Sequence, residues 1–497
     1  MLKKYLSVFG ALLMTGLCIG QTKKIEFIEY DLPNGIHVIL HENHSTPVAA
    51  VTLMYHVGSK NEKEGRTGFA HFFEHLMFEG TENIDRHQYD KYVEKAGGTL
   101  NANTSQDRTF YYELLPSNQV ELGLWLESER LLHAKVENIG IETQREVVKE
   151  EKRQRMDNQP YGSWQENIFK RAYSTHPYKW TVIGSMDDLN AAEEADYVNF
   201  YRTFYVPHNL TLSIAGDIDV EQTKKWIADY FGTIPNGDKL NIYRDKEFLS
   251  FEKFSKKYSK DLGEKVATKA FLDAFNGDMS TESFIATYFP NASEKPHNIP
   301  RPAVKEPLMK AQVIDTIYDN IQLPGLFMAY RTPELNHPDH YAVEMMTNIL
   351  SGGKSSRITK NVVEKKQQAI QAFIFPFDLE DPGIALTIGI AQKGIEITDL
   401  QKSFDIEIEK MQNELVSAEE LQKIQNQIEN DVISSFSNMA GIAENLAQYY
   451  TYYKGQTNLI NTEIDKYLAV TPEDIKRVAN TYFKPSNRVV LHFLPKQ

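Results

Sequence analysis

The segment from Gly68 to Phe78 constrains the fold most, because it places two histidines and a glutamate in an otherwise apolar run. On a helix, which turns about 100° per residue, His71 and His75 lie on one face and Glu74 flanks it. Two imidazoles at this spacing can bind one metal ion, for which zinc is expected, and the carboxylate can deprotonate the attacking water. The alternative, solvated or core histidines, is disfavoured because buried polar groups need partners.

A third metal ligand must come from elsewhere in the chain, since catalytic zinc sites usually have three protein ligands. The segment 145–152 reads as a charged helix, and Val147 and Val148 are taken to mark its inward face. Helical geometry then directs Glu151 to the centre of that face. The other glutamates of this segment have basic neighbours, as on a solvated helix face. Glu151 is therefore the candidate third ligand.

With these residues the chain resembles the pitrilysin or inverzincin zinc peptidases, a family that includes insulin-degrading enzyme and the mitochondrial processing peptidase. The family signature is H-x-x-E-H followed after about 75 residues by a glutamate, and the interval from His75 to Glu151 fits. The resemblance implies that His71, His75 and Glu151 bind one zinc ion (Zn²⁺) per chain. It also implies that Glu74 is the general base of a metalloendopeptidase that hydrolyses unfolded polypeptides or oligopeptides.

The resemblance also bears on the Asn101-Ala102 segment and on Gln144. In the family, an Asn-Ala segment forms an exposed edge strand that pairs with the substrate backbone, so Asn101 and Ala102 are candidate substrate contacts. A plain polar turn is the alternative for this segment. The family usually has an acid seven positions before the third ligand, whereas this chain has Gln144 there. We therefore expect no acid or base role for Gln144.

Two phrases recur along the chain in the same order, which indicates a duplicated domain. The aromatic pair, proline and asparagine of residues 204–209 return in residues 482–487, each time before an apolar strand. The sequence Tyr92–Lys95 is likewise echoed by Val362–Lys365.

The length of 497 residues exceeds what one hydrophobic core usually supports. We expect an N-terminal zinc peptidase domain over residues 24–236, a polar helical insertion and linker over 237–307, and a C-terminal inactive domain over 308–497. The resemblance implies an α+β fold in which two pitrilysin-type halves face each other around a chamber. Each half would be a mixed or antiparallel sheet flanked by helices.

The C-terminal copy lacks the metal ligands, because Met345–Gly353 stands where the metal helix would recur. A second site of this kind is therefore not expected. Many family members carry in this half an arginine and a tyrosine, seven apart, that hold the substrate carbonyl. Aligned with them, this chain has Val363 and Ile370. By analogy, we expect a sister pitrilysin-like chain that supplies the Arg/Tyr pair, or a homodimer.

Residues 1–20 have the pattern of a secretory signal peptide, with Lys3 and Lys4 before an apolar run, which predicts a periplasmic protein. A lipoprotein acylated at Cys18 is the alternative, but Leu17 is bulkier than that processing accepts. Removal of the signal would change the formal net charge from −14 to −16. This acidic balance argues against nucleic-acid binding, and no other stretch is apolar enough to cross a membrane.

Two other functions compete with the peptidase interpretation. A catalytically silent scaffold subunit would be expected to lose a metal ligand or the base, whereas this chain keeps all four residues. A structural zinc site would need four protein ligands, and nothing near the motif supplies a convincing fourth.

Overall fold

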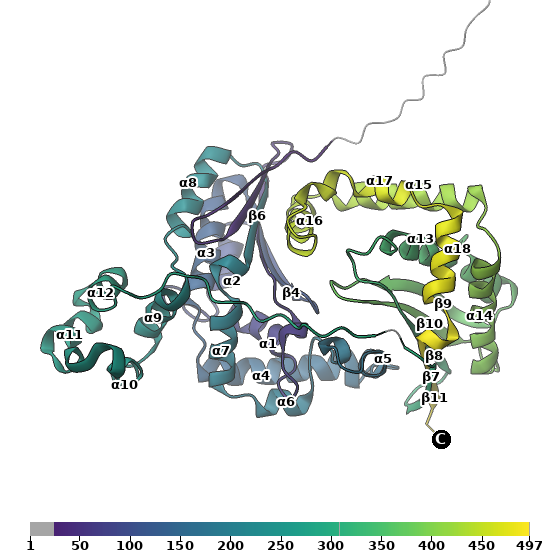
Figure 1. Ribbon diagram of the computed structural model, residues 1–497, viewed down its shortest axis with the longest axis horizontal. Coiled ribbons are helices and arrows are strands. Elements are labelled where there is room, and N and C mark those ends of the chain that lie inside the picture. Colours follow the sequence, from purple (N-terminus) through teal and green to yellow (C-terminus); the bar gives the residue numbers. More distant parts are fainter. Residues whose placement is uncertain (1–23, 308, 497) are drawn as a thin grey trace, which may run out of the picture.

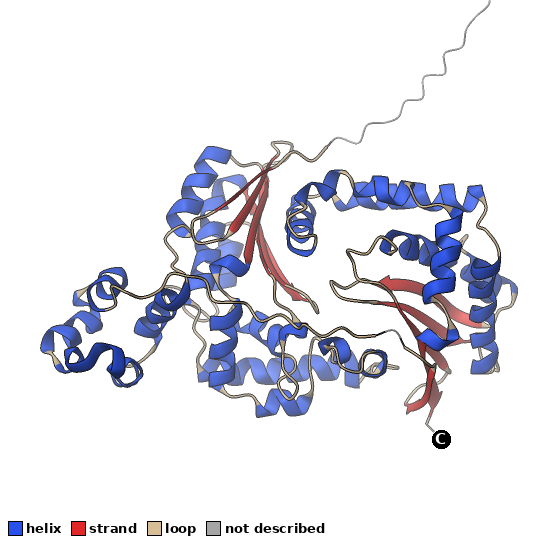
Figure 2. Cartoon of the chain, in the orientation of Figure 1, coloured by secondary structure: helices blue, strands red, loops and turns tan. Residues whose placement is uncertain are grey.

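The computed structural model describes residues 24–307 and 309–496, so the expected signal peptide lies outside the described residues. Two halves, each a sheet with helices, make up the structure (Figure 1, Figure 2). The first half is built on a six-stranded sheet and the second on a five-stranded sheet. In the described part of the chain, no helix combines the length and apolar character needed to cross a bilayer.

The first sheet has the strand order β1-β2-β6-β3-β5-β4. Strands β2 and β6 are parallel, and all other neighbours are antiparallel. The strands β2, β3 and β6 are buried along almost their whole length, β3 with a largely apolar sequence and β2 and β6 with polar residues that are buried as well. The six strands are β1 (Ile28–Asp31), β2 (His37–Glu42), β3 (Val48–Tyr55), β4 (Thr99–Thr104), β5 (Thr109–Pro116) and β6 (Leu210–Gly216).

The second sheet repeats this arrangement in the order β7-β11-β8-β10-β9. Here β7 and β11 are parallel and the other neighbours antiparallel, so each strand matches one of β2 to β6 in the first sheet. Residues 204–209 and their repeat at 482–487 lead into the corresponding strands β6 and β11, and Tyr92–Lys95 and its echo Val362–Lys365 lead into the corresponding strands β4 and β9. The predicted duplicated α+β fold is therefore confirmed. The five strands are β7 (Val313–Asp319), β8 (Gly325–Arg331), β9 (Ala369–Phe377), β10 (Ile384–Ala391) and β11 (Arg488–Pro495).

Apart from α8, the helices of the first half recur in the same order in the second half. The first half contains α1 (Phe69–Leu76), α2 (Tyr89–Lys95), α3 (Val120–His133), α4 (Asn138–Lys152), α5 (Trp164–Ala172), α6 (Met186–Ala191), α7 (Glu194–Phe204) and α8 (Val220–Tyr230). The second half contains α13 (His340–Ser351), the π-helix η8 (Thr359–Lys365), α14 (Ile397–Asn413), α15 (Ala418–Ser435), α16 (Met439–Tyr452), α17 (Glu463–Leu468) and α18 (Pro472–Tyr482). By position in this order, α1 corresponds to α13, and α5 corresponds to α16.

Each half lends one helix to the sheet of the other. Helix α16 of the second half packs on the first sheet, where Ile442 and Leu446 contact Ile39 and Ala50 (Figure 1). Helix α5 of the first half packs in the same way on the second sheet, around Phe169. Because α5 and α16 are counterparts, this exchange covers the face of each sheet that its own helices leave open.

A helical protrusion and an extended segment connect the two sheets. The helices α9 (Gly237–Phe248), α10 (Phe251–Leu262), α11 (Lys269–Asp273) and α12 (Thr281–Tyr288) project from the first half (Figure 1). Three fully buried phenylalanines, Phe254, Phe271 and Phe284, form the centre of the protrusion. Residues 292–307 then run without helix or strand along the first half, where the carboxylate of Glu306 accepts the backbone N–H groups of residues 174–176.

A cluster of charges, built on the buried pair of Lys60 and Asp107, joins the two halves. The ammonium group of Lys60, whose side chain is 4% exposed, lies 2.9 Å from Asp107 and 3.5 Å from Asp381, and it also pairs with Glu380. Asp107 lies in the β4–β5 loop, and Glu380 and Asp381 lie in the corresponding β9–β10 loop. The cluster therefore links equivalent loops of the duplicated halves through one lysine.

We expect Glu380→Gln to make stability less sensitive to acid. Burial acts to raise the pKa of Glu380, but His56 and Lys60 outweigh it and lower the pKa to about 2. Because the folded-state pKa lies below the unfolded value, the ionised carboxylate stabilises the folded state at neutral pH. This stabilisation is lost as pH falls from about 4.5 toward 2. Between pH 6 and pH 3, the free energy of unfolding should therefore fall on the order of 2 kcal/mol more in the wild type than in the variant. Denaturant unfolding at both pH values measures this.

Glu419→Gln, at an exposed site on α15, is the control for this experiment and should keep the wild-type acid response. An equal loss of stability in the wild type and in Glu380→Gln would contradict the assignment.

Candidate metal centre and its edge strand

Helix α1 is held in place by its own N-terminus and by an aromatic core. It begins after Gly68, whose φ of 84° favours glycine and whose backbone touches that of Ile183. The carboxylate of Glu62 accepts the N–H groups of Gly68 and Ala70, so the first turn is capped by a buried side chain. The rings of Phe72 and Phe73 pack against tyrosines that include Tyr197, Tyr201 and Tyr205. The helix face with His71 and His75 is thereby turned toward α4.

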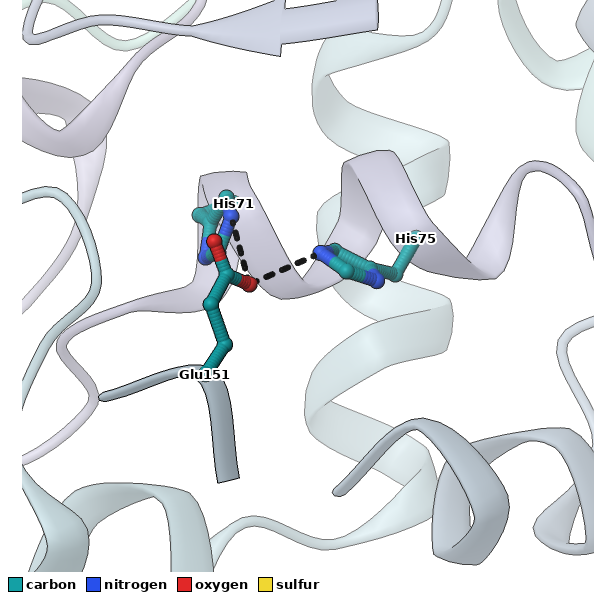
Figure 3. A group of neighbouring side chains, drawn as sticks. All are labelled: His71, His75 and Glu151. Atoms are coloured by element: carbon teal, nitrogen blue, oxygen red, sulfur yellow. Dashed lines mark ion pairs between the residues drawn. The ribbon is translucent and has the colours of Figure 1, made fainter. Parts of the chain in front are cut away.

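The structure brings the three predicted metal ligands together (Figure 3). Oε2 of Glu151 lies 3.5 Å from Nε2 of His71 and 3.4 Å from Nε2 of His75. Their side chains are 12%, 25% and 15% exposed for His71, His75 and Glu151. Within the described residues, no further His, Cys, Asp or Glu joins this group.

One premise of the prediction for Glu151 is wrong. Val147, which was expected to mark the inward face of this helix, is 45% exposed, while Val148 is fully buried. Glu151 reaches the site because it lies one turn after Val148, on the side of α4 that packs against α1. Glu146 and Glu150 are exposed and pair with Lys149 and Arg153, as expected for a solvated face.

Gln144 contacts the metal-binding group, which the sequence prediction missed. Nδ1 of His75 lies 3.1 Å from Oε1 of Gln144, to which it can donate its proton. The amide of Gln144 in turn donates to Glu79, and Glu79 pairs with Arg86. This series of side-chain contacts orients the His75 ring so that Nε2 faces Glu151. Gln144 lies seven residues before Glu151, two turns along the same helix, and that spacing was the available signal.

The charges of the group suit metal binding. Burial lowers the pKa of His71 to about 4, so this imidazole is neutral at pH 7. Burial also acts to lower the pKa of His75, but the contact with Glu151 raises it. Burial acts to raise the pKa of Glu151, but the hydrogen bond to His75 and the neighbouring His71 and Arg155 hold it below its usual value. Two imidazole nitrogens and one carboxylate from two helices form the donor set of a catalytic zinc site with an open position.

Glu74 lies beside this group and outside it. The hydroxyl of Thr104 on β4 donates to Oε2 of Glu74 at 2.5 Å. Burial raises the pKa of Glu74, and this hydrogen bond only partly opposes the shift. A partly desolvated carboxylate with raised proton affinity is suited to general-base chemistry. The sequence prediction missed Thr104, which is two residues after Ala102 on the same face of the strand.

The strand β4 is the edge of the first sheet, since its one neighbour in the described sheet is β5. Asn101 is exposed, and its side-chain oxygen accepts the N–H of Ala102 at 2.9 Å. Ala102 is half-buried and faces α1. Both residues therefore lie on an open strand edge next to Glu74, and their contact with substrate stays a prediction.

The corresponding place in the second half holds a different group. On α13, His340 lies 3.8 Å from Glu344 through Nε2 and 3.4 Å from Asp378 through Nδ1. Because its two nitrogens face different carboxylates, this imidazole is arranged for two ion pairs. Val363 is half-buried on η8, and Ile370 is 55% exposed on the edge strand β9. Neither residue offers a polar group to a substrate carbonyl.

We expect Gln144→Leu to weaken zinc binding by about 10-fold to 100-fold, as is usual when the group that orients a metal-binding histidine is lost. Leucine keeps the approximate size but cannot accept the Nδ1 proton of His75. Competition with a chromophoric chelator measures the affinity.

Gln154→Leu, at an exposed position past the end of α4, is the matched control and should leave zinc affinity unchanged. Equal affinities for Gln144→Leu and the wild type would show that Gln144 does not position His75.

Comparison with known protein families gives matches over both halves. A family model described as "Insulinase (Peptidase family M16)" matches residues 37–185, a range that includes His71, Glu74, His75 and Glu151. A second, "Peptidase M16 inactive domain", matches residues 193–428. The second range begins at α7 and therefore crosses from the first sheet into the second half.

Among curated relatives, the "Zinc protease PqqE" of Helicobacter pylori is 28% identical over 468 residues, which cover 93% of this chain and 92% of the relative. A probable mitochondrial-processing peptidase subunit beta of Arabidopsis thaliana is 23% identical over 463 residues, covering 91% of this chain and 75% of the relative.

Solved structures of the same fold include a protease from Helicobacter pylori, with a TM-score of 0.80, 26% identity and coverage of 95% of this chain and 100% of that chain. The periplasmic protease PqqL from Escherichia coli has a TM-score of 0.66 and 17% identity. This chain is 95% covered in that comparison but spans 48% of the PqqL chain.

Proposed function

The chain belongs to the peptidase M16 family, and we propose that it is an active zinc metalloendopeptidase that hydrolyses unfolded polypeptides or oligopeptides. The observation that carries this proposal is that Oε2 of Glu151 lies within 3.5 Å of both His71 and His75, with Glu74 beside them. Three ligands with an adjacent buried carboxylate are the parts of a hydrolytic site, whereas a structural zinc site would have four ligands.

In the proposed reaction, each residue has one task. When bound by His71, His75 and Glu151, zinc would supply Lewis-acid activation of the water and of the scissile carbonyl. Glu74 takes the proton from the attacking water and delivers it to the leaving amine. The hydroxyl of Thr104 holds one oxygen of Glu74, which leaves the other free to accept that proton. The open edge of β4 aligns the substrate backbone beside these groups.

A partner chain is part of the proposal. The places aligned with the Arg/Tyr pair hold Val363 and Ile370, so this chain lacks those groups for the substrate carbonyl. A sister chain of the same family could supply them, or two copies of this chain could associate. The two-part length of PqqL supports a paired arrangement of M16 units. The location we propose is the periplasm, on the basis of the signal-like residues 1–20.

A catalytically silent scaffold subunit is the second candidate function. It is favoured by the match of residues 193–428 to an inactive domain and by the absence of the Arg/Tyr pair. The intact set of ligands and base in the first half favours the peptidase instead.

Zinc analysis and peptide digestion of the purified chain distinguish the two functions. We expect one zinc ion per chain and cleavage of an unstructured peptide library that stops on chelation and returns with added zinc. The assay is run on the chain alone and on material co-purified from its native envelope. Cleavage that needs the co-purified partner would support the hetero-oligomer, and zinc-loaded material without any cleavage in either form would support the scaffold.

A further inference from the structure

A cavity of about 530 Å³ opens beside the proposed catalytic groups. Glu74 and His75 form one wall, α2 forms a second, and Gly98 with residues 99–102 of β4 forms the third. Phe78 and Leu100, both half-buried, give the cavity an apolar surface. The cavity is therefore a space directly next to the point of hydrolysis.

The strand alternation decides which substrate groups can enter this cavity. Along β4, Leu100, Ala102 and Thr104 are half-buried and their neighbours are exposed, so these three lie on the face covered by α1. Thr104 contacts Glu74 on that same face. A peptide that pairs with the open edge of β4 continues the pleat, so every second side chain points to this face. One of those side chains meets the cavity beside Glu74.

Two carboxylates stand at the cavity, on consecutive turns of α2. Asp90 and Glu94 are exposed, four residues apart, and neither forms an ion pair with any residue in the described part of the chain. No lysine or arginine is among the lining residues. An apolar wall with unpaired acids beyond it suits a side chain that has a long apolar stem and a cationic end.

We propose that this cavity selects a lysine or arginine side chain next to the scissile bond, with Phe78 and Leu100 contacting its stem and Asp90 and Glu94 its charge. This inference rests on the proposed peptidase function. It adds a preferred class of substrate, polypeptides with basic residues, and assigns Asp90 and Glu94 as specificity-determining residues.

The test uses a set of peptides with lysine, arginine, norleucine or glutamate at each position around one cleavage site. Norleucine matches the apolar stem of lysine without its charge. At one position adjacent to the cleaved bond, we expect kcat/KM for lysine or arginine to exceed that for norleucine by about fivefold, since two solvent-exposed ion pairs contribute modestly. High salt should reduce this ratio, because the charges are exposed.

In Asp90→Asn/Glu94→Gln we expect the lysine-to-norleucine ratio to fall to about one, and in Asp90→Lys/Glu94→Lys we expect the glutamate peptide to be preferred. Asp187→Asn, at an exposed site on α6, is the control and should keep the wild-type ratio. The same ratio in the wild type and both double variants would overturn this inference and leave the peptidase function standing. Hydrolysis of none of the peptides by the zinc-loaded wild type, either alone or with its co-purified partner, would refute the peptidase function itself.

Discussion

Glu74→Gln is expected to lower kcat/KM for peptide hydrolysis by about 10³-fold while the chain keeps its zinc ion. Glutamine has the shape of glutamate and can still accept the hydroxyl proton of Thr104. It cannot take a proton from water, so the loss falls on the chemical step. Zinc should be retained because Glu74 is not one of the three converging ligands.

The variant should also be at least as stable as the wild type. Burial raises the pKa of Glu74, which means that the folded state holds this carboxylate in an environment that disfavours its charge. A neutral amide removes that cost, as is common when a catalytic group is replaced. Thermal unfolding, metal analysis and initial rates on the same preparation measure all three quantities.

Glu150→Gln is the matched control for this experiment, since Glu150 is exposed on α4 and makes contacts only with neighbours on the same segment. It should keep the wild-type rate. Turnover of Glu74→Gln within a few-fold of the wild type would exclude Glu74 as the base.

The fold could be largely predicted because its signals are local or repeated. The buried strands β6 and β11 carry mostly apolar residues, and the recurring Pro-x-Asn phrase marks the entry to each of them. The exchange of α5 and α16 could not be predicted, because an amphipathic helix shows that it covers a sheet but not which one. Val147 illustrates the same limit: an apolar residue near a helix face was expected inside and is exposed.

Some residues of the candidate site could likewise be predicted from the sequence, and others could not. His71, Glu74 and His75 share one helix, so their spacing fixes their geometry. The position of Glu151 depends on how a second helix packs against the first. Helical geometry alone could therefore only narrow the choice among the glutamates of residues 145–152. Thr104 carried too little signal, since a threonine in a polar strand has many possible partners. The hydrogen bond from Thr104 to Glu74 follows only from the position of β4 beside Glu74 in the folded chain.

Lys60→Met is expected to lower the free energy of unfolding by about 3 to 5 kcal/mol, the usual cost of removing one partner from a buried ion cluster. Among the described residues, Lys60 is the one lysine or arginine that pairs with Asp107, Glu380 and Asp381 together. The side chain of Asp107 is 4% exposed, and without Lys60 its remaining hydrogen-bond donors in the described part of the chain are the hydroxyl of Tyr178 and the N–H of Glu380. Three negative charges would then repel one another between the two halves.

The exchange of α5 and α16 predicts how this loss should be observed. Since each sheet is covered by a helix of the other half, neither half can unfold without exposing part of the other core. We therefore expect one cooperative unfolding transition, which in Lys60→Met shifts to a lower denaturant concentration. Lys253→Met, at an exposed site on α10, should leave the transition in place. Adding Asp107→Asn to Lys60→Met should recover part of the loss by removing an uncompensated charge. If Lys60→Met instead unfolded at the wild-type denaturant concentration, the cluster would be a consequence of domain packing and not one of its causes.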